Sequence, residues 1–273
     1  MAQTGQLTRA PVAAALQLSQ VTWLRIAIVL TIVVVWEAVA RSGILFRQVV
    51  PSLVIIALAL ADLLSNPDLK VSLLGYDFSI PSFYWHLYVT VSEVLFAMII
   101  GGLAGLVVGL VLGGNPFLSQ AFERFLYYLG PTPKIVFFPV MIMWFGVGVE
   151  SKVAMGTLSC FFPIVLSVAA GMRQIESVLI RVGRSFRLNT WQMVVKIYLP
   201  AMREPIVNGV RIGMGVALIG TLLAETKLSN KGIGFMIIDA YNTFDMPKMY
   251  AVLLVLFVIA IGANALVGRA SRR

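Results

Sequence analysis

The side chains best suited to carry a function lie in one basic segment between two long apolar runs, residues 171–203. Its cations are Arg173, Arg181, Arg184, Arg187, Lys196 and Arg203, and its acids are Glu176 and Glu204. Apolar residues recur at three- and four-residue steps, which places them on one helix face and the cations on the other. These apolar residues are Ile175, Val178, Leu179, Val182 and Phe186. This pattern favours binding of a soluble partner over catalysis.

The segment is predicted to fold as a helix–turn–helix between membrane spans. Asn189 and Thr190 offer a break and a cap for a second helical piece, residues 191–198. We expect Pro200 to end that piece, because proline restricts the residue before it. A solvated basic loop is the alternative interpretation. The apolar periodicity favours docking.

A second group of polar residues lies near the ends of apolar runs. These residues are Glu93, Asn208, Arg211 and Glu225. Ionisable groups inside a membrane are costly and often mark a translocation path. Near the end of a span they can also reach the interface, and Glu225 could pair with Lys227. A path role is therefore a hypothesis for all four.

Enzyme chemistry is not indicated. No paired carboxylates, Cys/His cluster or nucleophile arrangement stands out, so we expect neither a catalytic residue nor a metal site. The single Cys160 allows no disulfide within the chain, and the lone His86 is interpreted as an interface residue. No G-x-x-x-x-G-K-[ST] phosphate-binding loop occurs, so nucleotide chemistry must lie on another polypeptide. We expect no cofactor on this chain.

The composition is that of a membrane protein with several spans. Of its 273 residues 59% are hydrophobic and only 12% are charged, which is too apolar for a soluble domain. The net charge of +9 could suggest nucleic acid. The cations lie at the ends of apolar runs, however, as the positive-inside rule describes, so the expected partner is the lipid bilayer and not nucleic acid.

About six transmembrane helices are predicted, because about 20 apolar residues cross a bilayer core. The expected spans are residues 23–40, 87–112, 131–145, 152–172, 205–224 and 249–267. Gly101, Gly105 and Gly109 form GxxxG steps that let another helix approach closely. Prolines make the third span irregular, and residues 117–130 are expected to be an interfacial helix. Residues 53–64 form a short surface helix, with turns at 66–68 and 75–81.

The charges predict the orientation. Residues 1–22 are expected to be a cytoplasmic tail, 23–268 the transmembrane domain with its basic segment at 173–203, and 269–273 a cytoplasmic end. Arg9, Arg25, Arg269, Arg272 and Arg273 then face the same side as the basic segment. Both termini on one side require an even number of spans, which six satisfies.

At the basic segment the sequence resembles permease subunits of ABC importers, in the nitrate/sulfonate/taurine-type branch. That family's cytoplasmic loop reads E-A-A-x3-G-x9-I-x-L-P, and its second half matches Ile197, Leu199 and Pro200. Further matches span residues 86–265. They comprise Trp191-Gln192, Pro205, Gly209-Val-Arg211, Leu129-Gly-Pro-Thr-Pro133, Phe138-Pro139, Trp144-Phe-Gly-Val-Gly148, Phe161-Phe-Pro163, Gly171-Met-Arg173, Ala224-Glu225 and Gly232-Ile-Gly234.

The chain departs from the family pattern at three positions. Arg181 stands where the family has glutamate, and Arg187 stands where it has glycine, which removes backbone freedom. Glu93 stands where this branch often has arginine. The first two departures imply a more acidic cleft on the partner or an altered coupling.

The resemblance implies an all-α membrane protein with the type I ABC importer permease fold. It implies a cytoplasmic coupling helix seated in a cleft of an ABC ATPase subunit, which binds ATP and Mg²⁺. The residues expected to couple to the ATPase are Glu176, Arg181, Val182, Gly183, Arg184, Phe186, Arg187, Leu199 and Pro200. The other implied partners are a second permease copy, identical or different, and a periplasmic or lipid-anchored solute-binding protein. The implied location is the bacterial inner membrane.

The substrate and two rival functions stay open. By analogy with the branch the solute is a small oxyanion or organic anion such as nitrate, a sulfonate or taurine, although related permeases carry vitamin precursors or aromatic carboxylates. A stand-alone secondary transporter or channel would predict mid-span ionisable residues and internal repeats. A degenerate permease acting as an assembly subunit is supported only by Arg181 and Arg187.

Overall fold

The computed structural model describes residues 10–43, 49–73 and 76–271. Arg9, Arg272 and Arg273 of the predicted charge pattern lie outside these residues. Five of the described helices are long and apolar enough to cross a membrane, and a bent helix pair brings the number to six if it counts as one span. This agrees with the predicted helical membrane fold.

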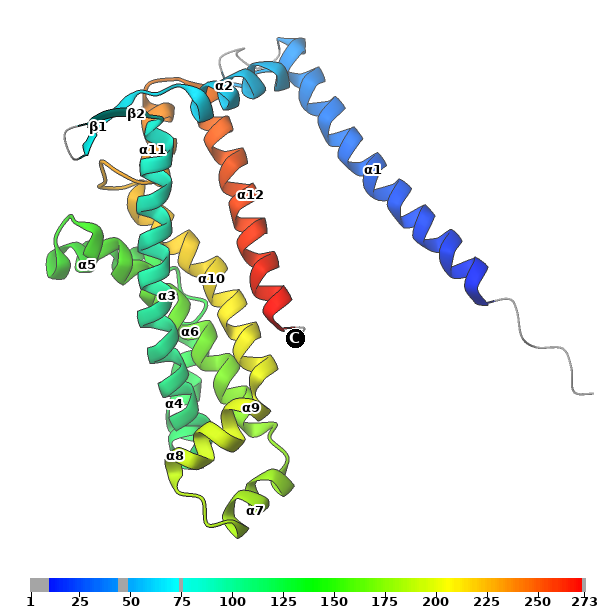
Figure 1. Cartoon of the computed structure of the whole chain (residues 1–273), viewed down its shortest axis with the longest axis vertical. Helices are drawn as coiled ribbons and strands as arrows, with labels where there is room; N and C mark the ends of the chain where they lie inside the picture. Colours follow the sequence, from blue (N-terminus) through cyan, green and yellow to red (C-terminus); the bar gives the residue numbers. More distant parts are fainter. Residues whose placement is uncertain (1–9, 44–48, 74–75, 272–273) are drawn as a thin grey trace, which may run out of the picture.

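Three long helices form the centre of the bundle (Figure 1). They are α3 (Ser82–Gly114), α6 (Val149–Arg173) and α10 (Arg203–Glu225), and α6 packs against both of the others. The apolar core between them includes Cys160, Ile164, Val168 and Ala217, all fully or almost fully buried. The core is therefore a helix interface and not a cavity.

Glycines on α3 set the distance between α3 and α6. A Cβ atom on Gly105 would lie 3.1 Å from the backbone oxygen of Phe161, and one on Gly109 would lie 3.0 Å from that of Val165. Backbone cannot move aside as a flexible side chain can. The GxxxG steps in the sequence therefore mark the residues at which α3 contacts α6.

The predicted third span is a broken element. α4 (Pro116–Leu129), which Asn115 caps, meets the 3-10 helix η1 (Lys134–Phe137) and α5 (Phe138–Phe145) at a bend of 94°. The break falls between the two predicted pieces, an interfacial helix at 117–130 and an irregular span at 131–145, and the two are long and apolar enough for a membrane span only together. Prolines at the bend prevent a continuous helix.

Shorter elements gather at the end of the bundle where α3 begins (Figure 1). They are α2 (Leu53–Ser65), the antiparallel hairpin β1 (Leu69–Leu73) and β2 (Tyr76–Ile80), and α11 (Ile233–Asn242). The last helix, α12 (Met246–Ser271), packs against α2, α10 and α11. The prediction of a turn at 75–81 was wrong, because residues 76–80 pair with 69–73 as a strand.

The first helix, α1 (Ala10–Ser42), stands apart from the bundle (Figure 1). It begins before the predicted span at 23, so helix replaces much of the expected tail. Near its C-terminal end, α1 is bonded to the residues around the start of α2. Trp36 Nε1 donates to the Pro51 oxygen at 3.2 Å, and Glu37 Oε2 accepts from Leu53 N at 3.1 Å. The Trp36 ring also packs edge-on against Tyr250.

The tight contact between α3 and α6 predicts the effect of adding one methyl group. Gly101→Ala should destabilise the bundle by about 1–3 kcal/mol, because its Cβ would lie 2.8 Å from the Thr157 backbone oxygen. Gly102→Ala is the matched control, since its Cβ would meet only a side-chain atom at 3.9 Å. Thermal unfolding in detergent measures both variants. Equal stability of the two would contradict the close contact.

Candidate functional site

The basic segment forms the end of the molecule opposite α2 and α11 (Figure 1). It joins α6 to α10 through α7 (Ser177–Ser185), α8 (Thr190–Met193), the π-helical turn Val194–Tyr198 and α9 (Leu199–Ala201). Since α6 and α10 belong to the central bundle, a force applied to this segment reaches the core through two helices.

The predicted apolar face of α7 is present and uncovered. Phe186 is 76% exposed, Val178 is 53% exposed and Val182 is 43% exposed. Gly183 is the buried residue of α7, and a Cβ there would collide with the Met193 sulfur of α8. The segment is therefore a compact helix pair that turns an apolar stripe toward solvent.

Arg187 forms the turn at the end of α7. It has a left-handed backbone with φ of 52°, a conformation that glycine adopts without steric cost. Leu188 N donates to the Gly183 oxygen at 3.1 Å and Arg187 N donates to the Arg184 oxygen at 2.9 Å, which is the Schellman pattern of a helix C-terminus. The arginine strains the turn but does not abolish it. The expected loss of backbone freedom therefore leaves the local fold intact.

The second helical piece begins as predicted and ends later. Asn189 and Gln192 form a capping box, with Asn189 Oδ1 accepting from Gln192 N at 2.8 Å. Pro200 does not end the helix, contrary to prediction, because helical structure continues through Ala201. The π turn explains this: Leu199 N bonds back five residues to the Val194 oxygen, so the helix ahead of the proline is already widened.

The predicted coupling residues all lie in this one segment. Their side chains are exposed, except that Leu199 is half-buried and Gly183 is buried. The exposed members are Glu176, Arg181, Val182, Arg184, Phe186, Arg187 and Pro200. The structure thus brings these residues together at one end of the bundle, with cations beside an uncovered apolar stripe.

Two of the predicted path residues meet at the opposite end. Glu93 of α3 and Glu225 of α10 are 1% and 0% exposed, and Glu93 lies one helical turn after Thr90, whose hydroxyl bonds to Glu225. Sequence reasoning found no paired carboxylates, and this was wrong. The two residues are distant in the chain, so only the packing of α3 against α10 reveals the pair.

The carboxyl pair is tied to α11 through Thr90. Glu225 Oε1 accepts from Thr90 Oγ1 at 2.7 Å, and Thr90 Oγ1 accepts from Ile233 N at 2.8 Å. Glu225 Oε2 accepts from Gly234 N at 2.6 Å. We call Glu93, Glu225, Thr90 and the first two residues of α11 the carboxyl network. It holds the start of α11 against α3 and α10.

Two further buried polar residues adjoin the carboxyl network. Lys152 of α6 is 5% exposed, and its charge acts on both carboxyl groups. Thr221 lies one turn before Glu225, and its hydroxyl lacks a partner in the described part of the chain, as does Glu93 Oε2. Sequence reasoning missed Thr90, Lys152 and Thr221. The three- and four-residue steps from Thr90 to Glu93 and from Thr221 to Glu225 were the available signal.

The other two predicted path residues lie near the coupling end. Asn208 and Arg211 of α10 line a pocket of about 390 Å³ with Asn264 and Arg269 of α12. Arg211 Nε donates to Asn264 Oδ1 at 2.6 Å. The four candidates therefore form two separate pairs at opposite ends of α10.

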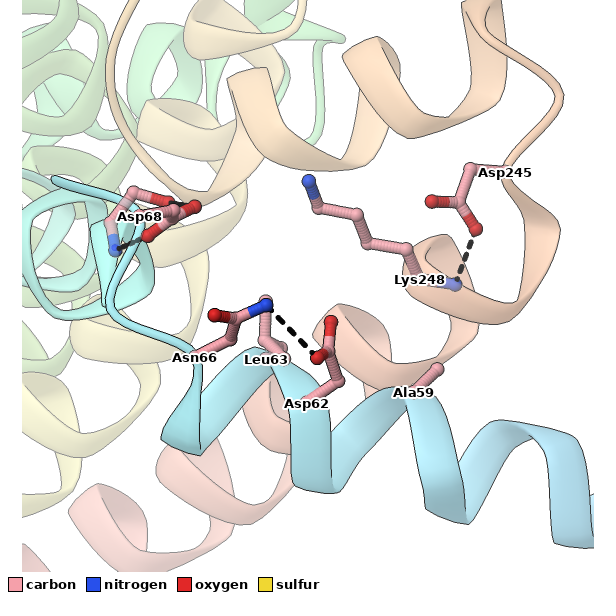
Figure 2. A pocket seen from close by; sticks show the side chains of 8 residues that line it. Ala59, Asp62, Leu63, Asn66, Asp68, Asp245 and Lys248 are labelled. Atoms are coloured by element: carbon pink, nitrogen blue, oxygen red, sulfur yellow. Dashed lines mark hydrogen bonds between the residues drawn. The ribbon is translucent and has the colours of Figure 1, made fainter.

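A polar pocket of about 270 Å³ lies between α2, the start of α3 and the start of α12. Figure 2 shows the Lys248 side chain extending across it, between acidic residues that include Asp68 and Asp245. Burial alone would raise the pKa of Asp68, but hydrogen bonds from the Ser82 hydroxyl and backbone N–H outweigh it and lower that pKa. These bonds connect the residue just before the hairpin to the first residue of α3.

The bundle of apolar helices with a helix pair at one end defines a membrane protein of the transporter permease class. The family model for the binding-protein-dependent transport system inner membrane component matches residues 101–273, and the chain belongs to this family. It is a multi-pass inner-membrane component. The sulfonate and taurine relatives described next confirm the expected nitrate/sulfonate/taurine-type branch.

Two relatives and one solved structure are similar to this chain. The putative aliphatic sulfonates transport permease protein SsuC of Bacillus subtilis is 26% identical over 84% of this chain and 78% of its own length. The taurine transport system permease protein TauC of Escherichia coli is 29% identical over 64% of each chain. The MetNI methionine ABC transporter, in an inward-facing conformation, matches 70% of this chain and 93% of its own with a TM-score of 0.59 and 19% identity, which confirms the type I importer permease fold.

The left-handed turn predicts a stabilising substitution. Arg187→Gly should stabilise the last turn of α7 by about 1 kcal/mol, since a non-glycine residue pays roughly that cost for this backbone. Slower hydrogen–deuterium exchange in residues 183–188 is the expected result. Arg184→Gly, inside the helix, should speed exchange because glycine weakens helices. Effects of the same sign in both variants would contradict the assigned turn.

Proposed function

We propose that the chain is the permease subunit of an ATP-driven importer and receives the stroke of its ATPase through α7. The observation that carries this proposal is the uncovered apolar stripe of Val178, Val182 and Phe186 beside exposed arginines. A stripe of this kind on a short helix fits a hydrophobic groove of a soluble partner. ATP and Mg²⁺ belong to that partner, as the sequence contains no phosphate-binding loop of its own.

The packing of the segment supports transmission of a mechanical stroke. α7 and α8 touch at Gly183, where the Met193 side chain packs directly against the glycine backbone. α6 and α10, which flank the segment, pack against each other along their length. Movement of the helix pair would therefore rotate α6 and α10 as packed rigid elements, which is a recognised route to alternating access.

The arginines of the segment point to an acidic groove on the ATPase. Arg181, Arg184 and Arg187 are exposed and surround the apolar stripe. Complementary charge across such a contact speeds association and fixes register. Because Arg187 still forms the turn, the alternative of a degenerate permease loses one of its two supports.

The proposed cargo is a small organic or inorganic anion. The similar permeases are described for sulfonates and for taurine, and the pocket at Asn208 and Arg211 offers amide and guanidinium donors suited to an oxyanion. Glu93 and Glu225 would meet the path only if the bundle opened at their end. We propose that two copies of the permease, identical or different, enclose the path, with a solute-binding protein at the α2 and α11 end.

The proposed orientation places α7 and both termini in the cytoplasm. The exposed arginines of the coupling segment and Arg269 at the last turn of α12 then lie on one side. This arrangement follows the positive-inside rule. It also requires an even number of spans, which the structure provides when the bent pair of α4 and α5 counts as one.

The docking model predicts that a charge on the apolar stripe releases the ATPase. Phe186→Asp should abolish co-purification of the ATPase subunit in detergent, because docking would bury the new carboxylate. Ser185→Asp is the matched control, since it adds the same charge to the neighbouring exposed position. Retention of the ATPase by Phe186→Asp would contradict the docking model.

The charge of the segment generates a separate prediction. Arg181→Glu should weaken ATPase binding about tenfold, since close charge pairs at interfaces couple by roughly 1.5 kcal/mol or more. The loss should shrink at high salt, where charges are screened. Lys231→Glu changes the net charge equally at the opposite end and should leave binding unchanged. Titration of the purified permease with ATPase at two salt concentrations measures both.

A further inference from the structure

We propose that the pair of carboxyl groups of Glu93 and Glu225 carries one proton in total and that this proton resides on Glu93. The proton thereby fastens the start of α11 to the bundle. The site is a proton-binding site built from the carboxyl network. It concerns the end of the molecule away from the coupling segment, so it stands whether or not α7 docks an ATPase.

The first step is that the two carboxyl groups cannot both be ionised. They are 1% and 0% exposed, and Glu93 lies one helical turn after Thr90, whose hydroxyl bonds to Glu225 Oε1 at 2.7 Å. Burying an ionised carboxylate is costly unless hydrogen-bond donors or an opposite charge compensate it. Two adjacent buried negative charges would also repel each other in a medium with little water.

The second step locates the proton. The Thr90 hydroxyl accepts from Ile233 N at 2.8 Å, which leaves its single hydrogen to donate to Glu225 Oε1 at 2.7 Å. Gly234 N–H donates to Glu225 Oε2 at 2.6 Å. Both Glu225 oxygens therefore accept, as they do in a carboxylate. Glu93 Oε2, by contrast, is buried and has no hydrogen-bond partner in the described part of the chain, so Glu93 is the group that must be neutral and carries the proton.

The third step is the charge balance of the site. Lys152 of α6 acts on both carboxyl groups, and its Nζ donates to the Gly148 oxygen at 2.9 Å. One carboxylate and one ammonium leave the buried site neutral, whereas two carboxylates would leave an uncompensated charge. On α3, His86 accepts from Gly232 N at Nδ1, so that nitrogen carries no proton. Within the described residues, both salt bridges lie elsewhere, at Glu37 and Glu123.

The consequence for the fold follows from the position of Glu225. Its carboxylate lies against Gly232 so closely that a Cβ there would collide with it, and Gly232 needs its φ of 99° to begin α11. A proton on Glu93 keeps Glu225 anchored as acceptor of the α11 amide. Loss of the proton would set two like charges against each other and loosen the contact between α3, α10 and α11.

Infrared difference spectroscopy on the full chain in an ester-free detergent at pH 7 tests the site directly. The wild-type protein should show the C=O stretch of one protonated carboxylic acid, which shifts in D₂O. Glu93→Gln should remove that band completely. A wild-type spectrum without such a band, or a band that survives Glu93→Gln, would overturn the proposal.

Thermal unfolding of two isosteric variants tests the location of the proton independently. Glu93→Gln should keep wild-type stability, because a neutral amide of the same shape replaces a neutral carboxylic acid. Glu225→Gln should lower the melting temperature, because its NH₂ group must face either the Gly234 N–H or the Thr90 hydroxyl. The reverse order of stabilities would place the proton on Glu225 and refute the assignment, even if the band were present.

Discussion

The close approach of three helix backbones is the constraint on which the rest of this structure depends. α3, α6 and α10 touch where glycines or other small residues leave room, and the neighbouring backbone oxygens lie where side chains would otherwise project. In lipid no hydrophobic force drives helices together, so this packing must supply the association. Both candidate sites lie at the ends of these three helices, so the packing of the helices positions the residues of each site.

The two ends of the bundle are stabilised by different interactions. At the coupling end, the helix pair of α7 and α8 exposes its apolar residues and depends on a capping box and a left-handed turn for its shape. At the other end, Thr90 and Glu225 are buried and bond to each other and to the first amides of α11.

Much of this architecture was predictable from the sequence, and the failures have physical causes. The long apolar runs, the GxxxG steps and the amphipathic coupling helix follow from local periodicity, which the sequence displays directly. The hairpin and the continued helix at Pro200 depend on local geometry that propensity does not fix, whereas the prolines did indicate the break between α4 and α5. The pairing of Glu93 with Glu225 depends on tertiary contact, and no spacing within one helix can predict it.

The length of α3 places the carboxyl network at a particular depth. The helix has 33 residues and extends about 50 Å, whereas a bilayer's hydrocarbon core is about 30 Å thick. Glu93 lies 21 residues before Gly114, about 31 Å along the axis from the end that leads to α4. If that end meets one membrane surface, Glu93 lies at the level of the opposite headgroups. The network is then dry because protein covers it, with water only a short distance away.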